Sequence, residues 1–148
     1  MSDLYFKVVN PIVKSLLKSP LHGLMSKNTV LLEFKGRKSA KTYTTPISYH
    51  FQAGKLHCFS NKSFGWWRNL IDAEQVSLTW KGKQVLGKPT VVIDQPEVMQ
   101  KALTDFLIAV PRDAEHSGVA LDSAKQPMQR DVAEAVPNMV YISIELLQ

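Results

Sequence analysis

The feature that most constrains the fold is a series of short strand-like runs joined by tight turn signals, from Thr29 to Asp94. The runs are rich in β-branched and aromatic residues, and one short helical turn that begins at Trp66 interrupts them. Two connections carry hairpin signals, Ala53-Gly54 and Lys81-Gly82-Lys83. This order favours an antiparallel sheet over the strand–helix–strand alternation of a doubly wound fold.

The expected strands cover residues 30–34, 42–51, 55–60, 76–81, 83–94 and 139–146. In the last of them, Val140, Ile142 and Ile144 alternate cleanly with more polar positions. Pro46 restricts its strand to an edge, a bulge or a bend, and Gly87 with Pro89 predicts a bulge where the sheet bends. We therefore predict an α+β, mainly β fold, a small β-barrel of antiparallel strands with peripheral helices.

Helical signals flank these strands. Asn10-Pro11 and Ser19-Pro20 each resemble a helix start, and they predict helices over 11–18 and 21–25. A further helix is expected from about residue 95 to Val110, where Pro111 ends it, and a short one over 126–136. We interpret residues 1–148 as a single domain, with an N-terminal helical segment (1–27) followed by the barrel (28–148).

Composition narrows the class of protein. The 148 residues are 45% apolar with a net charge of +5, which is typical of a globular protein. No apolar run approaches the roughly 18 residues of a membrane span, and we expect a cytoplasmic protein. The apolar stripe from Leu4 to Leu17 carries flanking lysines, so it fits either core packing or contact with a membrane surface. No nucleic-acid-binding motif is present, and we expect no nucleic-acid partner.

The sequence Gly36-Arg37-Lys38-Ser39-Ala40-Lys41-Thr42 joins two expected strands. It combines three cations, two hydroxyls and a glycine, which together can bind phosphate oxygens. The same composition also fits a solvated basic turn. The residues alone leave both interpretations open.

The remaining reactive side chains give no catalytic pattern. The histidines at positions 22, 50, 57 and 116 lack paired metal-ligand spacing, and the single Cys58 is interpreted as a small core residue. His57 fits a partly exposed strand position better than a catalytic one. We find no nucleophile elbow, P-loop or Gly-x-Gly-x-x-Gly, and we expect no metal site. If the protein is an enzyme, a bound cofactor is expected to carry the chemistry.

Four segments in order give a resemblance to a known family: Ser19-Pro20-Leu21-His22, Gly36-Arg37-Lys38-Ser39, Tyr43-Thr44-Thr45-Pro46 and Trp66-Trp67-Arg68-Asn69-Leu70. The sequence resembles the deazaflavin (F420)-dependent nitroreductases over nearly its whole length. That family has the split β-barrel that FMN-dependent proteins of the pyridoxamine-phosphate-oxidase type also use. The resemblance therefore implies a split-barrel oxidoreductase that binds coenzyme F420, with FMN as the alternative.

The resemblance implies a role for two groups of residues around the cofactor's phosphate and ring. The phosphate and acidic tail of F420 would bind the basic loop, through Arg37, Lys38, Ser39 and Lys41. The strand beside the ring system would contribute Thr44, Thr45 and Pro46. Ala40 stands where the family usually has a second glycine, and alanine does not by itself favour a positive φ.

Two further groups would complete the implied pocket. Donors along the ring or ribityl chain would come from Ser60, Asn61 and Lys62, and the pocket would be closed by Trp66 and Asn69. The segment from Val110 to Ala114 lacks the tyrosine that the family would place near the substrate. The resemblance therefore assigns no proton donor, and the catalytic residues stay unknown.

The implied reaction is hydride transfer from the reduced cofactor to a flat electrophile such as a quinone, a nitroaromatic or an enone. A reaction of this kind depends on close stacking and on exclusion of water more than on a protein acid. A non-catalytic carrier of an anionic planar ligand is the alternative from another functional class. Split barrels commonly pair across a sheet face, so a homodimer is also expected.

Overall fold

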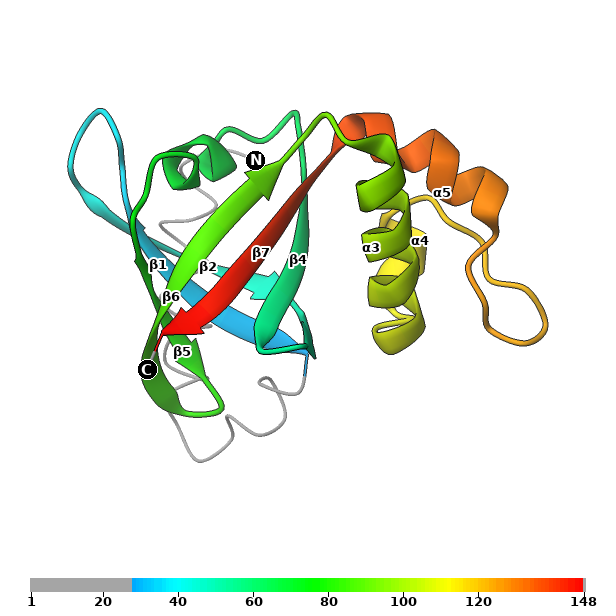
Figure 1. Cartoon of the computed structure of the whole chain (residues 1–148), viewed down its shortest axis with the longest axis horizontal. Helices are drawn as coiled ribbons and strands as arrows, with labels where there is room; N and C mark the ends of the chain where they lie inside the picture. The colour runs from blue at the N-terminus through cyan, green and yellow to red at the C-terminus, as the bar shows by residue number, and fades with distance from the viewer. Residues whose placement is uncertain (1–27, 148) are drawn as a thin grey trace.

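The structure is a computed structural model that describes residues 28–147. Seven antiparallel strands form one sheet in the order β2-β1-β5-β6-β7-β4-β3, and the sheet curls into a half-barrel (Figure 1). The strands are β1 (Thr29–Lys35), β2 (Thr42–Ser48), β3 (His50–Gln52), β4 (Lys55–Asn61), β5 (Val76–Trp80), β6 (Lys83–Val92) and β7 (Met139–Leu147). The helices expected over 11–18 and 21–25, and the membrane contact suggested for the stripe from Leu4 to Leu17, lie outside the described residues.

The interior of the curled sheet holds the first of two hydrophobic cores. β1, which lies between β2 and β5, is almost continuously apolar. In β7, which lies between β6 and β4, apolar residues alternate with more polar ones. Val140, Ile142 and Ile144 of β7 are fully buried in this core, as their period of two predicts. Cys58 also lies here, fully buried, which confirms its interpretation as a small core residue.

The strand expected over residues 42–51 is divided at Tyr49, and the single long strand is therefore wrong. The pairing of β2 with β1 ends where Ser48 meets Thr29. The Tyr49 N–H then donates to the Asn28 carbonyl oxygen at 2.9 Å, and the chain crosses to pair with β4 as β3. Pro46 lies in β2, an end strand of the sheet, where a missing N–H is tolerated.

Both expected hairpin turns are present. Ala53 and Gly54 have φ of 54° and 77°, and Lys81 and Gly82 have φ of 51° and 78°. Two successive positive φ values are the requirement of a type I′ turn, whose twist matches that of the flanking strands. These turns set the registers of β3 with β4 and of β5 with β6.

The bulge expected at Gly87 and Pro89 is wrong. The pairing of β6 with β7 runs unbroken from Leu86 to Val92. Gly87 is required for another reason: a Cβ at this position would lie 2.4 Å from the Ile144 Cγ2 atom. Beyond Gly87, β6 is paired with β7 but no longer with β5, so a proline is tolerated there.

The helices gather on the side of the sheet where β4 and β7 lie (Figure 1). They are α3 (Pro96–Ala109), α4 (Asp113–His116), α5 (Gln129–Ala135) and a 3-10 turn η2 (Val136–Asn138). The second hydrophobic core joins α3 and α5 to the outer face of the sheet, through Leu103, Phe106, Val132 and Tyr141. The helices predicted after residue 95 and over 126–136 are therefore confirmed within a few residues.

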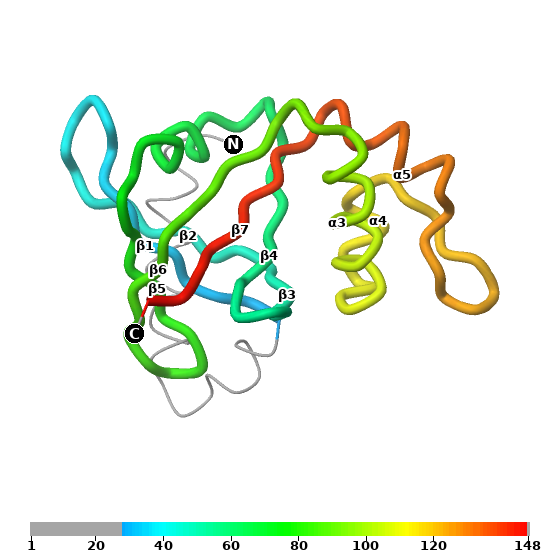
Figure 2. The backbone as a smooth tube through the Cα atoms, in the orientation of Figure 1, coloured from blue at the N-terminus to red at the C-terminus, as the bar shows by residue number. Residues whose placement is uncertain are grey.

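The β1–β2 loop, residues 36–41, projects from the end of the molecule away from these helices, as Figure 2 shows. The short 3-10 helix η1 (Trp66–Leu70) lies near the base of this loop (Figure 2). Residues that the resemblance assigned to the cofactor therefore lie in two regions: the projecting loop with η1, and the junction between the barrel and the helices.

Candidate functional site

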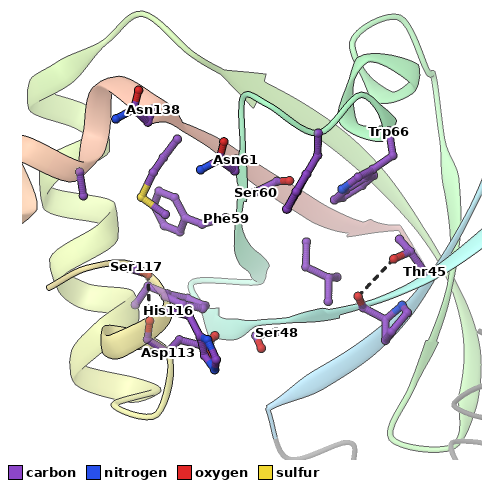
Figure 3. Close-up of a pocket in the computed structure, with 16 residues that line it drawn as sticks. Thr45, Ser48, Phe59, Ser60, Asn61, Trp66, Asp113, His116, Ser117 and Asn138 are labelled. Carbon is purple, nitrogen blue, oxygen red and sulfur yellow. Dashed lines mark hydrogen bonds between the residues drawn. The ribbon is translucent and has the colours of Figure 1, made fainter. Parts of the chain in front are cut away.

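A cavity of about 560 Å³ lies between the barrel and the helices. One wall comes from β2, β4 and the segment that leads into η1, and the other from α3, α4 and the connection of α5 to β7. Its residues are Thr45, Pro46, Ile47, Ser48, Phe59, Ser60, Asn61, Phe64, Trp66, Phe106, Asp113, His116, Ser117, Ala135, Asn138 and Met139. Figure 3 shows Trp66 and Thr45 on the barrel side and His116 and Asp113 on the helix side.

Five residues that the resemblance assigned to the cofactor lie in this cavity: Thr45, Pro46, Ser60, Asn61 and Trp66. They come from three segments of the chain, and the curl of the sheet brings them together. Thr45 is buried, and its hydroxyl donates to the Pro46 carbonyl oxygen at 3.3 Å. The Asn61 Oδ1 accepts the Ser63 N–H at 2.9 Å, which orients that amide.

The two adjacent tryptophans have different roles. Trp67 is 3% exposed and belongs to the barrel core with Leu70. Trp66 is half-buried and lines the cavity, with its ring centroid 5.8 Å from that of Phe34. The indole of Trp66 is therefore a flat, core-supported surface beside open space.

The basic loop has a defined backbone. The Gly36 N–H donates to the Lys41 carbonyl oxygen at 2.8 Å, and the Ala40 N–H donates to the Gly36 carbonyl oxygen at 2.9 Å. Ala40 has φ of 58°, so it adopts the left-handed conformation although it is not glycine. The side chains of Arg37, Lys38 and Lys41 are exposed.

The loop does not line the same cavity as the ring-side residues. Arg37 and Asn69 line a second hollow of about 550 Å³, with residues of β1, β5 and the η1–β5 connection. Neither hollow is lined by Lys38, Ser39, Lys41, Thr44 or Lys62. The Ser39 hydroxyl instead accepts the Lys41 N–H at 3.3 Å, and the Lys62 N–H donates to the Asn138 carbonyl oxygen at 2.9 Å.

Asn69 connects the two regions. Its Oδ1 accepts the Arg37 N–H at 2.9 Å, and its Nδ2 donates to the Trp66 carbonyl oxygen at 2.9 Å. One side chain therefore bonds both to the basic loop and to the residue that forms the aromatic wall of the cavity.

The helix side of the cavity was missed by sequence reasoning. Its residues Phe106, Asp113, His116 and Ser117 come from a segment whose pattern predicted only a helix and a loop. The position of α4 depends on Arg112, a contact that no local pattern reveals. The Arg112 guanidinium donates to the Asn28 carbonyl oxygen at 3.2 Å and to the Thr29 and Ser48 hydroxyls at 3.0 and 3.5 Å.

A third cavity, of about 420 Å³, lies between β3, β4, β7 and α3. It contains His57, whose Nε2 lies 3.1 Å from the Gln52 carbonyl oxygen and whose Nδ1 lies 2.6 Å from the Tyr141 Oη. Burial lowers the pKa of His57 and raises the pKa of Tyr141. Since a carbonyl only accepts, the neutral ring carries its proton on Nε2 and the Tyr141 hydroxyl donates to Nδ1. The partly exposed strand position expected for His57 is confirmed.

Across residues 28–147, no three His, Cys, Asp or Glu side chains are grouped as metal ligands would be. Within the same range, no helix has the length and apolar character that crossing a bilayer requires.

No protein-family model and no curated protein matches this chain. Solved structures do match it. An F420-H2-dependent reductase, FDR-A, is 19% identical over 78% of this chain and 93% of its own, with a TM-score of 0.52. An FMN-binding protein related to pyridoxamine 5′-phosphate oxidase, from Nostoc punctiforme, is 9% identical over 93% of this chain and 78% of its own, with a TM-score of 0.56.

A third structure, described as a domain-swapped dimer, is 18% identical over 93% of this chain and 97% of its own, with a TM-score of 0.55. At these identities the likeness concerns the fold. The chain therefore has the split β-barrel, the fold that the resemblance implied and that it shares with an F420-H2-dependent reductase and an FMN-binding protein.

Proposed function

We propose that this protein is a reductase that binds a flavin-type cofactor, with F420 preferred over FMN, and reduces a planar electrophile. The observation that carries the proposal is the cavity in which Thr45-Pro46, Ser60-Asn61 and Trp66 come together. When bound, the reduced cofactor would supply a hydride. The protein's part is to hold the ring and the acceptor in stacking distance and to exclude water.

The residues present fit a planar ring. The cavity volume of about 560 Å³ lies within the range of small-molecule sites. Its aromatic residues Phe59, Phe64, Trp66 and Phe106 offer flat apolar surfaces, and Thr45, Ser60 and Asn61 offer polar atoms on one side. A mostly apolar site with a few polar groups is the usual composition of a cofactor pocket.

The preference for F420 rests on the basic loop. Arg37, Lys38 and Lys41 extend into solvent, and a phosphate with a long acidic tail would satisfy more of these charges than the single phosphate of FMN. In this arrangement the ring would lie in the cavity beside Trp66, and the tail would pass η1 toward the loop. Asn69 would keep these two regions in register through its bonds to Arg37 and Trp66.

The acceptor class follows from the shape of the same cavity. Quinones, nitroaromatics and enones are flat and apolar, and they need few specific contacts. An aromatic cavity selects such molecules only loosely, so we propose activity on several of them. The solved structure described as a domain-swapped dimer also supports a homodimer here, which light scattering on purified protein tests.

The test is a titration of the full-length protein with F420 and with FMN, followed by tryptophan fluorescence, because Trp66 lines the cavity. We expect micromolar or tighter binding of F420 and weaker binding of FMN. Oxidation of F420-H2 by quinone and nitro acceptors then separates a reductase from a carrier. If neither cofactor binds at micromolar concentration, the proposal is overturned; tight binding without oxidation by any acceptor favours a non-catalytic carrier.

A further inference from the structure

The cavity contains few side chains of the kinds that act as general acids or bases. Of the described residues that line it, Asp113 carries a carboxyl group and His116 an imidazole. The others are aromatic, aliphatic, hydroxyl, amide or thioether side chains. Both titratable groups belong to α4 and face the barrel wall across the cavity (Figure 3). The two lining side chains of the general acid or base type therefore both belong to α4.

The two groups are in different environments. The Asp113 Oδ1 lies 3.7 Å from the Arg112 Nε, so this carboxylate has a cationic partner. The His116 side chain makes no hydrogen bond or ion pair with the rest of residues 28–147 and is exposed. Its imidazole is therefore available to a ligand in the cavity and open to proton exchange with water.

The helix that carries His116 is held in place. Arg112 bonds to Asn28, Thr29 and Ser48 at the ends of β1 and β2. The Ser117 hydroxyl donates to the Asp113 carbonyl oxygen at 2.9 Å, which closes the single turn of α4 on its far side. Arg112 therefore anchors the start of α4 to the barrel, and the Ser117 bond closes the turn that carries His116 beside the cavity.

We propose that His116 is the catalytic proton donor of the reaction proposed above, on which this inference rests. The acceptor gains two electrons and one hydrogen as hydride from the reduced cofactor. A protonated imidazole N–H of His116 donates its proton to the acceptor's carbonyl or nitro oxygen, and the neutral ring regains a proton from solvent. The group suits this task because imidazole is the side chain that most often serves as a general acid or base. The acceptor class is accordingly one with an oxygen at the reducible group.

The first test compares His116→Gln with His50→Gln in F420-H2 oxidation by duroquinone. His50 lies in the cavity between β3 and α3 and serves as the matched control. We expect His116→Gln to lower kcat/KM about 100-fold, the typical effect of losing a general acid, with F420 affinity within twofold of wild type. The wild-type rate should fall as the pH rises from 6 to 8, and this fall should disappear in His116→Gln.

The second test does not depend on turnover. In protein with ¹⁵N-labelled histidine, duroquinone should shift the ring-nitrogen resonances of His116 and leave those of His50 unchanged. An absent shift of His116, or equal shifts of both, would overturn the proposal. So would a His116→Gln enzyme with wild-type rate and pH profile.

The two proposals fail in different ways. If wild-type protein binds neither F420 nor FMN, the proposed function is wrong and the role of His116 falls with it. If the cofactor binds and is oxidised normally by His116→Gln, the function stands and the role of His116 alone is overturned.

Discussion

The Arg37 N–H and the Asn69 Oδ1 are joined by a hydrogen bond of 2.9 Å, although the two residues lie in segments far apart in the sequence. The same Asn69 side chain donates to the Trp66 carbonyl oxygen at 2.9 Å. The amide therefore satisfies one backbone donor of the projecting loop and one backbone acceptor of η1.

Replacing Asn69 by alanine removes both hydrogen bonds. We expect Asn69→Ala to lower the free energy of unfolding by about 1 kcal/mol, because each net hydrogen bond contributes about that much and one of the two is exposed. F420 affinity should fall further than FMN affinity, since the loop loses its fixed position relative to Trp66. Urea denaturation and the two cofactor titrations measure these effects.

The matched variant is Asn69→Asp. A carboxylate can still accept from the Arg37 N–H but cannot donate to the Trp66 carbonyl oxygen. Asn69→Asp should therefore keep the β1–β2 loop in place better than Asn69→Ala does, although it removes the hydrogen bond to η1. Identical behaviour of the two variants would mean that the bond to Arg37 does not position the loop.

Replacing both Arg37 and Lys38 by alanine tests the placement of the acidic tail. Both side chains are exposed, and exposed charge pairs contribute about 0.2–1 kcal/mol each. We expect about a tenfold loss of F420 affinity and a smaller loss for FMN, and the difference should shrink at high salt. Fluorescence titration at two ionic strengths measures the loss of affinity for each cofactor and its dependence on salt.

The control for charge alone is Lys55→Ala with Lys83→Ala, two exposed lysines at hairpins outside both hollows. This variant loses the same number of cations. If the control variant lowers F420 affinity as much as the loop variant does, the effect comes from net charge. If the loop variant loses affinity for F420 and FMN equally, or for neither, the acidic tail binds elsewhere.

Local patterns in the sequence account for most of the fold. Alternation in β7, the two hairpin turns and the proline that starts α3 depend on near neighbours, and each was predictable. The division at Tyr49 was not, because it depends on where β1 begins, at Thr29 opposite Ser48. The false bulge at Gly87 has a similar cause: the close approach of Ile144 comes from a distant strand, and a glycine signal alone does not distinguish the two cases.

The candidate site divides in the same manner. The resemblance named residues on the barrel wall, such as Thr45 and Trp66, because they belong to recognisable segments. His116 carried no such signal, since its place depends on Arg112 anchoring α4 to the barrel. The resemblance assigned the basic loop and the ring-side residues to different parts of one cofactor. Arg37 lines a hollow separate from the ring-side cavity, and Asn69 connects the two regions.

The His57–Tyr141 pair predicts a loss of stability in acid. Burial is the main cause that lowers the pKa of His57, and His50 and Lys55 act in the same direction against the Gln52 carbonyl and Asp105. The folded state therefore binds a proton less readily than the unfolded state. The contribution of neutral His57 to the free energy of unfolding is fully present above the unfolded-state pKa of about 6.5. It falls as the pH drops toward 5.

Urea denaturation between pH 5 and 8 measures this dependence. His57→Gln should flatten the loss between pH 7 and 5 relative to wild type. Tyr141→Phe removes the hydroxyl that donates to Nδ1 at 2.6 Å and should cost about 1 kcal/mol at pH 8. An unchanged slope in His57→Gln would assign the acid sensitivity to other groups.

Gly87→Ala should strongly destabilise the barrel, because the new Cβ would lie 2.4 Å from the Ile144 Cγ2 and 3.2 Å from the Leu78 Cδ1. Both neighbours are fully buried, so neither side chain can move aside without disturbing the core, and we expect a loss of about 2–3 kcal/mol. Gly65→Ala is the control, because a Cβ there meets nothing within 4 Å and the φ of −97° suits alanine. Chemical denaturation measures the stability of both variants. A Gly87→Ala protein within 0.5 kcal/mol of wild type would show that β6 and β7 can separate at this position, and that Gly87 serves as a flexible bend instead.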